Sequence, residues 1–218
     1  MRWSWTEERK SLAEAGYRLV AGVDEVGCGC LAGPVVAAAA ILPPELHLQG
    51  LRDSKQLRPA EREDLYERAL RRGLACAVGL AYVEEIDQVN IFHAARLAMR
   101  RAVDALSPRP DFLLMDGHLP PQFGLPCKAI VKGDALCPSI SLASVMAKVY
   151  RDRLMRRLAR LFPFYGWEDN KGYGTAYHYR ALEIYGPCPL HRRSFAPVGR
   201  AAQMSLDLED NEFLESDD

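Results

Sequence analysis

The sequence lacks any long apolar run, and this absence bounds where the protein can reside. Its longest apolar stretch extends only from Val35 to Leu42, far short of the roughly 20 residues that a membrane helix needs. Residues 1–10 are polar and charged, without the apolar segment of a secretory signal peptide. We therefore expect a cytoplasmic protein that makes no membrane contact.

The six cysteines lack the C-x-x-C spacing and the matching histidine cluster of a structural zinc site. In a reducing cytosol, scattered cysteines of this kind are expected as thiols rather than disulfides. Cys28 and Cys30 lie together in a glycine-rich segment. A redox or soft-metal role for that pair is the alternative interpretation.

A strong net charge is also lacking, but the formal value of −1 hides an asymmetry. Residues 204–218 contain seven acidic residues and no basic ones. Without them, 28 basic residues face 22 acidic ones, so residues 1–203 carry about +6. A moderately cationic body permits nucleic-acid binding, although it does not by itself indicate it.

The hydropathy pattern predicts an α/β domain with a mixed sheet. In the helix expected over 90–106, Ile91, Ala95, Ala98, Met99 and Ala102 form a core-facing stripe. The first three strands are expected to neighbour one another as an antiparallel meander. Strands are predicted over 18–26, 34–42, 74–83, 112–115 and 128–131, and helices over 6–16, 59–72, 90–106, 139–161 and 176–185. Residues 163–198 are expected to form a small helical cap, and 199–218 a mostly disordered acidic tail.

Four carboxylates stand where predicted strands end or helices begin: Asp24, Glu25, Asp116 and Asp134. In an α/β sheet such positions converge at one edge, so acids distant in sequence can meet in space. Crowded carboxylates repel one another unless cations neutralise them. Oxygen-only ligands suit Mg²⁺ or Mn²⁺, and two such ions can clamp the attacking and leaving oxygens of a phosphodiester.

Structural roles compete with this interpretation. An Asp after a strand is often a helix N-cap or a turn former, above all for Asp116 and Asp134 beside glycine. Asp24 and Glu25 could instead form ion pairs with Lys132 or Arg52. Neighbouring strand residues also point to opposite faces. Either a bulge or twist near Gly27 brings both acids to one site, or one contributes through its backbone carbonyl.

The same residues carry a family resemblance. The opening segment resembles that of the ribonuclease HII family and reads GVDEVGCGCLAGPVVAAA. Later blocks follow in the family's order: DSKQL (53–57), IDQVNI (86–91), MDG (115–117), KGD…SISLASVMAKVYRD (132–152) and NKGYGTAYHYRAL…YGPCPLHRRSFAPV (170–198). The resemblance covers roughly residues 17–198, and so many ordered blocks make a chance match implausible.

The resemblance implies a ribonuclease H-like catalytic domain over 1–162, whose mixed sheet is flanked by helices, with a small C-terminal helical extension over 163–198 that completes the substrate cleft. It implies an endonuclease, expected as a monomer, that hydrolyses RNA in RNA–DNA hybrids and nicks 5′ of single ribonucleotides in duplex DNA during ribonucleotide excision repair. The ends would be a 3′-hydroxyl and a 5′-phosphate. Carried over by motif, Asp24, Glu25, Asp116 and Asp134 are the metal-binding catalytic acids of a two-ion Mg²⁺ or Mn²⁺ site.

Substrate contacts also follow from the resemblance. Gly27, Cys28 and Gly29 occupy the loop whose backbone approaches the ribose, where a 2′-hydroxyl separates RNA from DNA. Tyr173 matches an aromatic that stacks on a sugar, although a half-buried core tyrosine is the plain alternative. Cys28 stands where the family usually has arginine, which predicts an active enzyme with weaker binding or looser selectivity.

Basic residues supply further candidate contacts. Lys55 and Lys148 lie in family blocks and are expected to contact phosphates, whereas the arginines that follow Lys148 on the same predicted helix also suit a solvated face. His178 is interpreted either as an aid to proton transfer or as a packing residue.

The tail segment QMSLDL resembles the short motif by which bacterial repair proteins bind the sliding clamp. Gln203 would set the register, and Leu206 and Leu208 would anchor the peptide in an apolar groove. The alternative is a plain solubilising acidic tail.

Two other classes of function compete with the hydrolase. A non-catalytic hybrid-binding protein would have a site decayed at Cys28, but the presence of all four acids disfavours it. Another metal nuclease or strand-transfer enzyme on the same fold is disfavoured only through the resemblance, because the glycine loop and the KGYGT block resemble those of ribonuclease HII.

Overall fold

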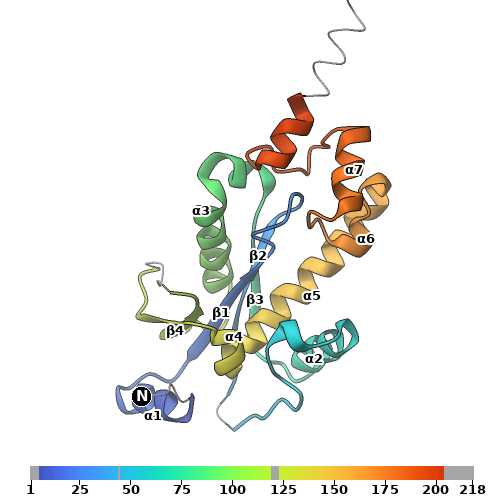
Figure 1. Cartoon of the computed structure of the whole chain (residues 1–218). Coiled ribbons are helices and arrows are strands. Elements are labelled where there is room, and N and C mark those ends of the chain that lie inside the picture. Colours follow the sequence, from blue (N-terminus) through green and yellow to red (C-terminus); the bar gives the residue numbers. More distant parts are fainter. Residues whose placement is uncertain (1–4, 44, 119–122, 204–218) are drawn as a thin grey trace, which may run out of the picture. The chain divides into compact units, whose positions relative to one another are not determined.

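The computed structural model describes residues 5–43, 45–118 and 123–203 of the chain (Figure 1). Its strands and helices, in chain order, are α1 (Trp5–Glu14), β1 (Val20–Val26), β2 (Val35–Ile41), the short 3₁₀ helix η1 (Ser54–Gln56), α2 (Pro59–Arg71), β3 (Cys76–Ala81), α3 (Val83–Asp104), β4 (Phe112–Asp116), β5 (Cys127–Ile130), α4 (Gly133–Leu136), α5 (Pro138–Leu161), the 3₁₀ helix η2 (Pro163–Tyr165), α6 (Trp167–Asn170) and α7 (Ala176–Tyr185).

Most of these elements were predicted from the sequence, and the exceptions have local causes. The segment 83–89 is helical, and a break at Asn90, with φ 65° and ψ 166°, separates it from the predicted helix. The four-residue helix α4 was also missed, because so short an element has no hydrophobic period to detect. Residues 199–203, predicted as the start of the tail, are helical, and Ala201 among them is buried.

The chain divides into two compact units. The first comprises 1–26, 35–80 and 95–151, and the second comprises 27–34, 81–94 and 152–218. The second unit therefore combines the predicted cap with two earlier segments. Within the described part of the chain, no helix is both long and apolar enough to cross a membrane.

The sheet has five strands in the order β3-β2-β1-β4-β5 and is mixed, as predicted. Strand β1 is antiparallel to β2 and parallel to β4, and β4 is parallel to β5. The first three strands are neighbours, as expected, but β2 reaches β3 through η1 and α2 rather than through a short turn. Every residue of β2 is buried, which suits its run of alanine and valine.

The core of the first unit forms where α2 and the first half of α5 cover one face of the sheet. Val36, Ala38 and Ala40 of β2 pack there with Leu65 of α2 and Leu142 of α5. Burying such side chains contributes about 25 cal/mol for each Å² of apolar surface removed from water. A second cluster joins Leu12 of α1 to Leu114, Ile130 and Ile140.

Gly22 in β1 allows the start of α5 to approach the sheet closely. A Cβ atom at this position would lie 2.1 Å from the backbone carbon of Ser139. Only glycine therefore allows the start of α5 to rest directly on β1. This contact places the α4–α5 segment, which contains Asp134, beside the strand that carries Asp24.

Candidate active site

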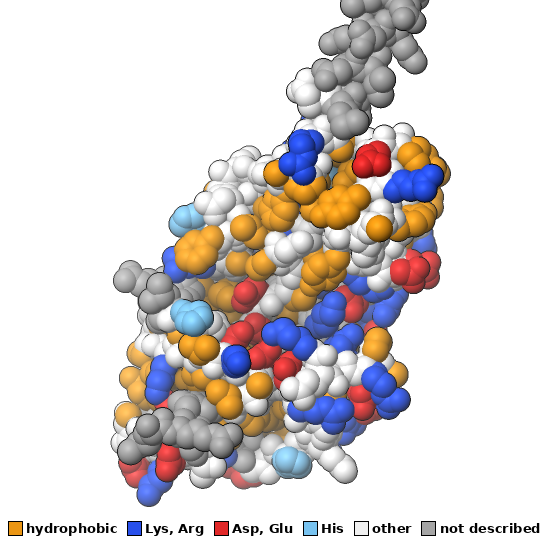
Figure 2. Space-filling model, viewed as in Figure 1, with side chains coloured by type: hydrophobic (Ala, Val, Ile, Leu, Met, Phe, Trp, Pro, Cys, Tyr) orange, Lys and Arg blue, Asp and Glu red, His pale blue; other side chains and the backbone are white. Residues whose placement is uncertain are grey.

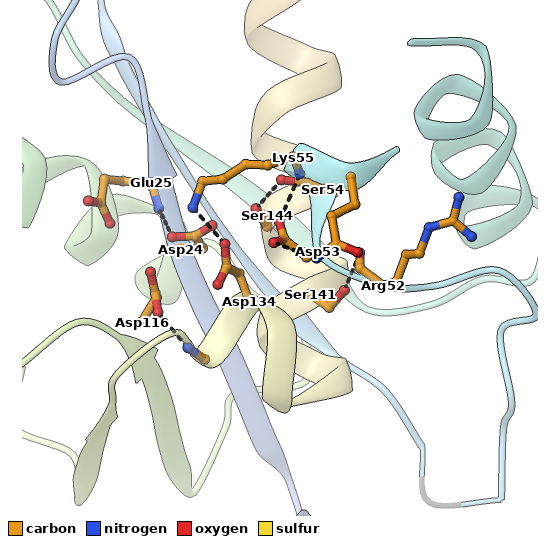
Figure 3. Close-up of polar contacts among 12 residues, drawn as sticks. Asp24, Glu25, Arg52, Asp53, Ser54, Lys55, Asp116, Asp134, Ser141 and Ser144 are labelled. Atoms are coloured by element: carbon orange, nitrogen blue, oxygen red, sulfur yellow. Dashed lines mark hydrogen bonds and ion pairs between the residues drawn. The ribbon is translucent and has the colours of Figure 1, made fainter. Parts of the chain in front are cut away.

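Three of the four predicted acids converge at the end of the sheet in the first unit (Figure 3). Asp24 lies near the end of β1 and Asp116 ends β4, and the parallel register of Val23 with Met115 brings these ends level. Asp134 enters from the first turn of α4. Asp24 and Asp134 are buried, with 6 % and 4 % of their surfaces exposed. The predicted convergence of distant acids is present in the fold.

The side chain of Glu25 lies near the other three but on the other side of β1 from that of Asp24 (Figure 3). Strand β1 stays in register with β2 through Val26, so no bulge separates Asp24 from Glu25, and the twist at Gly27 (φ 93°) comes after both acids. The two side chains accordingly lie on opposite sides of the strand (Figure 3). The bulge considered from the sequence is absent. Asp116 nevertheless repels Glu25 electrostatically.

The position of Asp116 has a local structural cause. One of its carboxylate oxygens accepts a hydrogen bond of 2.7 Å from the backbone N–H of Gly133, at the start of α4. The turn-forming role considered for Asp116 is therefore real, and it links β4 to the segment that carries Asp134. Asp134 does not cap its helix, because the N-cap position belongs to Lys132.

The cation that reaches this cluster is Lys55. Its ammonium lies 2.7 Å from a carboxylate oxygen of Asp134 and also attracts Asp24 (Figure 3). The alternative ion pairs of Asp24 or Glu25 with Lys132 or Arg52 are not found among the described residues. Arg52 instead forms an ion pair with Glu61, at 3.2 Å. Acidic and basic side chains also meet on the face drawn in Figure 2.

The sequence DSK at 53–55 builds the support for this ammonium. The Asp53 carboxylate accepts a 2.8 Å hydrogen bond from the backbone N–H of Lys55 and so caps η1. The buried hydroxyl of Ser54 lies 2.8 Å from that of Ser144 on α5, which donates to Asp24. Because Ser144 donates its proton to Asp24, Ser54 must be the donor to Ser144. Neither serine was singled out in the sequence, although both lie in blocks shared with the family.

Burial and mutual repulsion disfavour the charged forms of three of these carboxyl groups. Burial, and then repulsion by Glu25 and Asp116, raises the pKa of Asp24 well above its usual value. Burial and the charge of Asp116 raise the pKa of Glu25. Burial also raises the pKa of Asp116, and the hydrogen bond from Gly133 opposes that rise. The hydrogen bond to Asp134 raises the pKa of Lys55, so its ammonium form is favoured there.

No described group of three or more Asp, Glu, His or Cys side chains forms a ready-made cage for a metal ion. The chemistry of the donors still fits hard divalent cations, because all are carboxylates. Lys55 indicates that this cluster accepts a positive charge. Lys148 lies one helical turn beyond Ser144 on α5, and therefore on the same side of that helix.

The predicted sugar contacts lie together in the second unit. The N–H of Leu31, which follows the glycine loop, donates a 2.8 Å hydrogen bond to the carbonyl of Gly172, next to Tyr173. Tyr173 is 39 % exposed, so part of its side chain is accessible to a ligand, as it also would be in a half-buried tyrosine. A side chain at Gly29 would meet no atom within 4 Å, so its backbone is open to solvent.

The remaining predicted features are placed as follows. Gln203 is exposed in the helix over 196–203, whereas Leu206 and Leu208 lie outside the described residues. The six cysteines, all within the described residues, form no disulfide. His178 is buried in the second unit, whereas the four acids belong to the first.

A mixed sheet in the order β3-β2-β1-β4-β5, with acids at the ends of β1 and β4, places the protein in the class of the ribonuclease H-like fold. Solved structures agree with this class. Ribonuclease H2 from Pyrococcus horikoshii OT3 superposes with a TM-score of 0.72 at 28 % identity, over 86 % of this chain and 98 % of the other. The ribonuclease HII of a complex with PCNA from Archaeoglobus fulgidus gives a TM-score of 0.71 at 27 % identity, over 87 % and 99 %.

The family model for ribonuclease HII matches residues 21–198. Ribonuclease HII from Acidovorax sp. strain JS42 is 56 % identical over 185 residues, covering 85 % of this chain and 88 % of the relative. The enzyme from Desulfitobacterium hafniense strain DSM 10664 / DCB-2 is 50 % identical over 201 residues, covering 92 % and 76 %. The chain belongs to the ribonuclease HII family, whose members are endonucleases that cleave RNA in RNA–DNA hybrids and at single ribonucleotides.

Proposed function

We propose that Asp24, Glu25, Asp116 and Asp134 carry the hydrolysis by holding two divalent ions, Mg²⁺ or Mn²⁺. The observation that supports this most directly is the excess of negative charge around Lys55, since the pKa values of Asp24, Glu25 and Asp116 are all raised. When bound, two such ions lower the pKa of a water molecule for attack at phosphorus and stabilise the leaving 3′-oxygen. That chemistry produces a 3′-hydroxyl and a 5′-phosphate.

The protein's own residues hold and orient the reacting groups. Asp24 and Asp134 are buried, so the surrounding core limits their motion. Asp116 is fixed by its hydrogen bond from Gly133. The side chain of Glu25 lies across the strand from Asp24 (Figure 3), so we assign its contribution to its backbone carbonyl. Lys55 is 77 % exposed along its side chain, and its ammonium can exchange Asp134 for a substrate phosphate.

Recognition of the ribonucleotide is assigned to the second unit. The backbone of Gly27, Cys28 and Gly29 approaches the ribose and distinguishes its 2′-hydroxyl, and the exposed ring of Tyr173 stacks on a neighbouring sugar. The hydrogen bond between Leu31 and Gly172 supports this assignment, because it ties the two contacts together. We assign Lys148 to a phosphate contact, and we propose that the enzyme nicks 5′ of a single ribonucleotide. The helical segment 163–198 is proposed to complete the substrate cleft.

A cleavage assay on a DNA duplex with one ribonucleotide tests the acidic site. We expect nicking 5′ of the ribonucleotide with Mg²⁺ or Mn²⁺, none with EDTA, and none on an all-DNA duplex. Asp24→Asn should abolish cleavage, whereas the exposed Glu45→Gln should not change it. If Asp24→Asn kept wild-type turnover, or if no RNA-containing substrate, including a long hybrid, were cut with either metal, the assignment would be wrong.

We also propose that Gln203, Leu206 and Leu208 bind a sliding clamp. The relative from Archaeoglobus fulgidus was solved in complex with PCNA, which supports a clamp as partner. In a pull-down with purified clamp, a Leu206→Ala/Leu208→Ala variant should lose binding while its cleavage rate stays unchanged. Equal binding by the variant and the wild type would contradict the proposal.

A further inference from the structure

The segment 190–194 in the second unit connects the two proposed sugar contacts. Its backbone pairs with the end of the glycine loop: the N–H of Gly33 donates to the carbonyl of Leu190 at 2.9 Å, and the N–H of Arg192 donates to that of Leu31 at 2.9 Å. The far end of the segment is anchored by the carboxylate of Asp87, which accepts from the N–H groups of Arg193 and Ser194 at 3.0 Å each. The segment is thus fixed on both sides.

The side chain of Arg192 binds the glycine loop directly. It is fully buried, and its Nη1 donates a 2.9 Å hydrogen bond to the carbonyl of Cys28. Its Nε and Nη2 both donate to the carbonyl of Gly33, at 3.0 and 2.8 Å. The guanidinium also faces the ring of Phe195, 5.2 Å from the ring centre. A rigid, planar donor of this kind holds the two carbonyls in a fixed relative geometry, which the flexible ammonium of lysine does not impose.

The orientation of the loop follows from the planarity of the peptide bond. The C=O of Cys28 and the N–H of Gly29 belong to one trans peptide and point in opposite directions. Because Arg192 holds the carbonyl of Cys28 inside the fold, the N–H of Gly29 is directed away from Arg192. Gly29 is exposed, so this donor faces solvent and is available to a hydroxyl or an ether oxygen of a sugar.

His191, the residue before Arg192, is connected to Tyr173 by a chain of hydrogen bonds through His178. The N–H of Cys188 donates to Nδ1 of His191 at 3.0 Å. A neutral His191 therefore carries its proton on Nε2, which lies 3.0 Å from Nε2 of His178. That nitrogen accepts, so the proton of His178 is on Nδ1, 2.9 Å from the carbonyl of Tyr173.

The surroundings keep this histidine pair neutral. Trp167 donates from Nε1 to Nε2 of His178 at 3.2 Å, which confirms that this nitrogen is an acceptor. Burial lowers the pKa of His178, and burial together with His178 lowers the pKa of His191 to about 3. Only neutral rings satisfy the sequence of donors and acceptors, so the chain of hydrogen bonds persists at neutral pH.

We infer that His191, through His178, and Arg192 are positioning residues that set Tyr173 and the glycine loop in register for the sugar of the ribonucleotide. The adjacent backbone positions of His191 and Arg192 transmit any displacement of one contact to the other. This inference rests on the proposed role of Tyr173 and the glycine loop in substrate recognition. It assigns no chemical step to either residue.

A double-mutant cycle tests the histidine branch, with kcat/KM measured on a duplex carrying one ribonucleotide. His178→Leu should lower kcat/KM by up to about a hundred-fold, as a displaced contact can. In a Tyr173→Ala background, the same change should cost little more, because residues that act through one another are not additive. Equal losses in both backgrounds would overturn the inference.

The conservative variant His178→Asn separates positioning from general stability. Its amide nitrogen takes the place of Nδ1 and can still donate to the carbonyl of Tyr173, so its kcat/KM should return towards the wild-type value. If His178→Asn lost as much activity as His178→Leu while keeping the wild-type melting temperature, the hydrogen bond to Tyr173 would have no role. Exposed His47→Asn is the matched control.

Arg192→Lys tests the loop branch, with the exposed neighbour Arg193→Lys as its control. We expect KM to rise about ten-fold or more with a smaller change in kcat, because the acidic cluster is untouched and only the oriented contact is lost. This loss should persist in the Tyr173→Ala background. An unchanged KM in Arg192→Lys would overturn this branch.

These outcomes also separate the inference from the proposed function. If Tyr173→Ala alone left kcat/KM unchanged, the proposed recognition of the sugar would fail. If Tyr173→Ala were damaging but His178→Leu and Arg192→Lys behaved as wild type, only the positioning inference would fail.

Discussion

The acidic site of the first unit and the 190–194 segment of the second handle buried polar groups in opposite ways. At the acidic site, Asp24 is buried beside other acids, its pKa is raised, and the exposed side chain of Lys55 brings positive charge to the cluster. In the 190–194 segment, Arg192 and the histidine pair are buried with oriented hydrogen-bond partners. The first arrangement favours added cations, whereas the second is satisfied without any ligand.

This difference in how buried polar groups are satisfied separates a site suited to ion binding from one suited to substrate recognition. An electrostatic imbalance near a surface is suited to bind ions and to stabilise charge that develops during a reaction. A satisfied hydrogen-bond network is suited to hold a recognition surface in one geometry. Three changes test this contrast, in order of decreasing expected effect.

Lys55→Ala should have the largest effect. Removal of a charged hydrogen bond of about 1.5–3 kcal/mol should lower kcat/KM by roughly ten- to a hundred-fold. Because the ammonium no longer competes at Asp134, the Mg²⁺ concentration for half-maximal activity should fall. Both quantities follow from one metal titration, with exposed Lys10→Ala as control. A rise in the required Mg²⁺ would show that Lys55 helps to form the metal site instead.

Cys28→Arg should have an intermediate effect. Arg192 holds the loop through the backbone carbonyl of residue 28, which any residue type supplies. A substitution at this position therefore changes only the contact that its side chain makes with the duplex. One added charge-assisted hydrogen bond of about 1.5 kcal/mol would strengthen binding of the duplex roughly ten-fold. The dissociation constant, measured without metal, checks this value. Unchanged affinity and selectivity would remove any significance from the cysteine at this position.

The smallest of the three expected effects is that of Asp24→Asn on the melting temperature, measured apart from its effect on cleavage. A carboxyl whose pKa is raised in the folded state destabilises the fold above that pKa, and the cost disappears below its unfolded pKa, about 4. In EDTA at about pH 8, Asp24→Asn should therefore melt higher than wild type, by about 2–4 °C for each kcal/mol.

The pH and metal dependence of melting complete this test. The advantage of Asp24→Asn should shrink as the pH falls towards about 4, because wild-type Asp24 then becomes protonated. Mg²⁺ should raise the melting temperature of the wild type more than that of the variant. A pH-independent difference between the two proteins would show that charge at Asp24 does not limit stability.

Much of the fold was predictable because its signals are local. The buried run of β2 and the boundaries of α7 followed from composition and hydrophobic period. The break at Asn90 was not predictable, because left-handed backbone at a single residue leaves no periodic trace. The missed α4 has the same explanation, since four residues form barely one helical turn.

The convergence of Asp24, Asp116 and Asp134 could be predicted from the sequence, but the arrangement of the side chains around them could not (Figure 3). All four acids could be named from their positions after apolar runs and from the family blocks. That Glu25 lies across β1 from the others depends on an unbroken register with β2. The supporting serines, Ser54 and Ser144, gave no signal of their own because a hydroxyl becomes informative only when its partner is known.

The sequence by itself was enough to identify a set of acids with only oxygen ligands, a glycine-rich loop, and the family to which these motifs belong. These features are local, so they survive without three-dimensional information. Only the tertiary structure decided that Lys55 reaches Asp134, and that His191 and Arg192 connect the loop to Tyr173. Such contacts join residues far apart in the chain, and the packing within each unit selects which of them form.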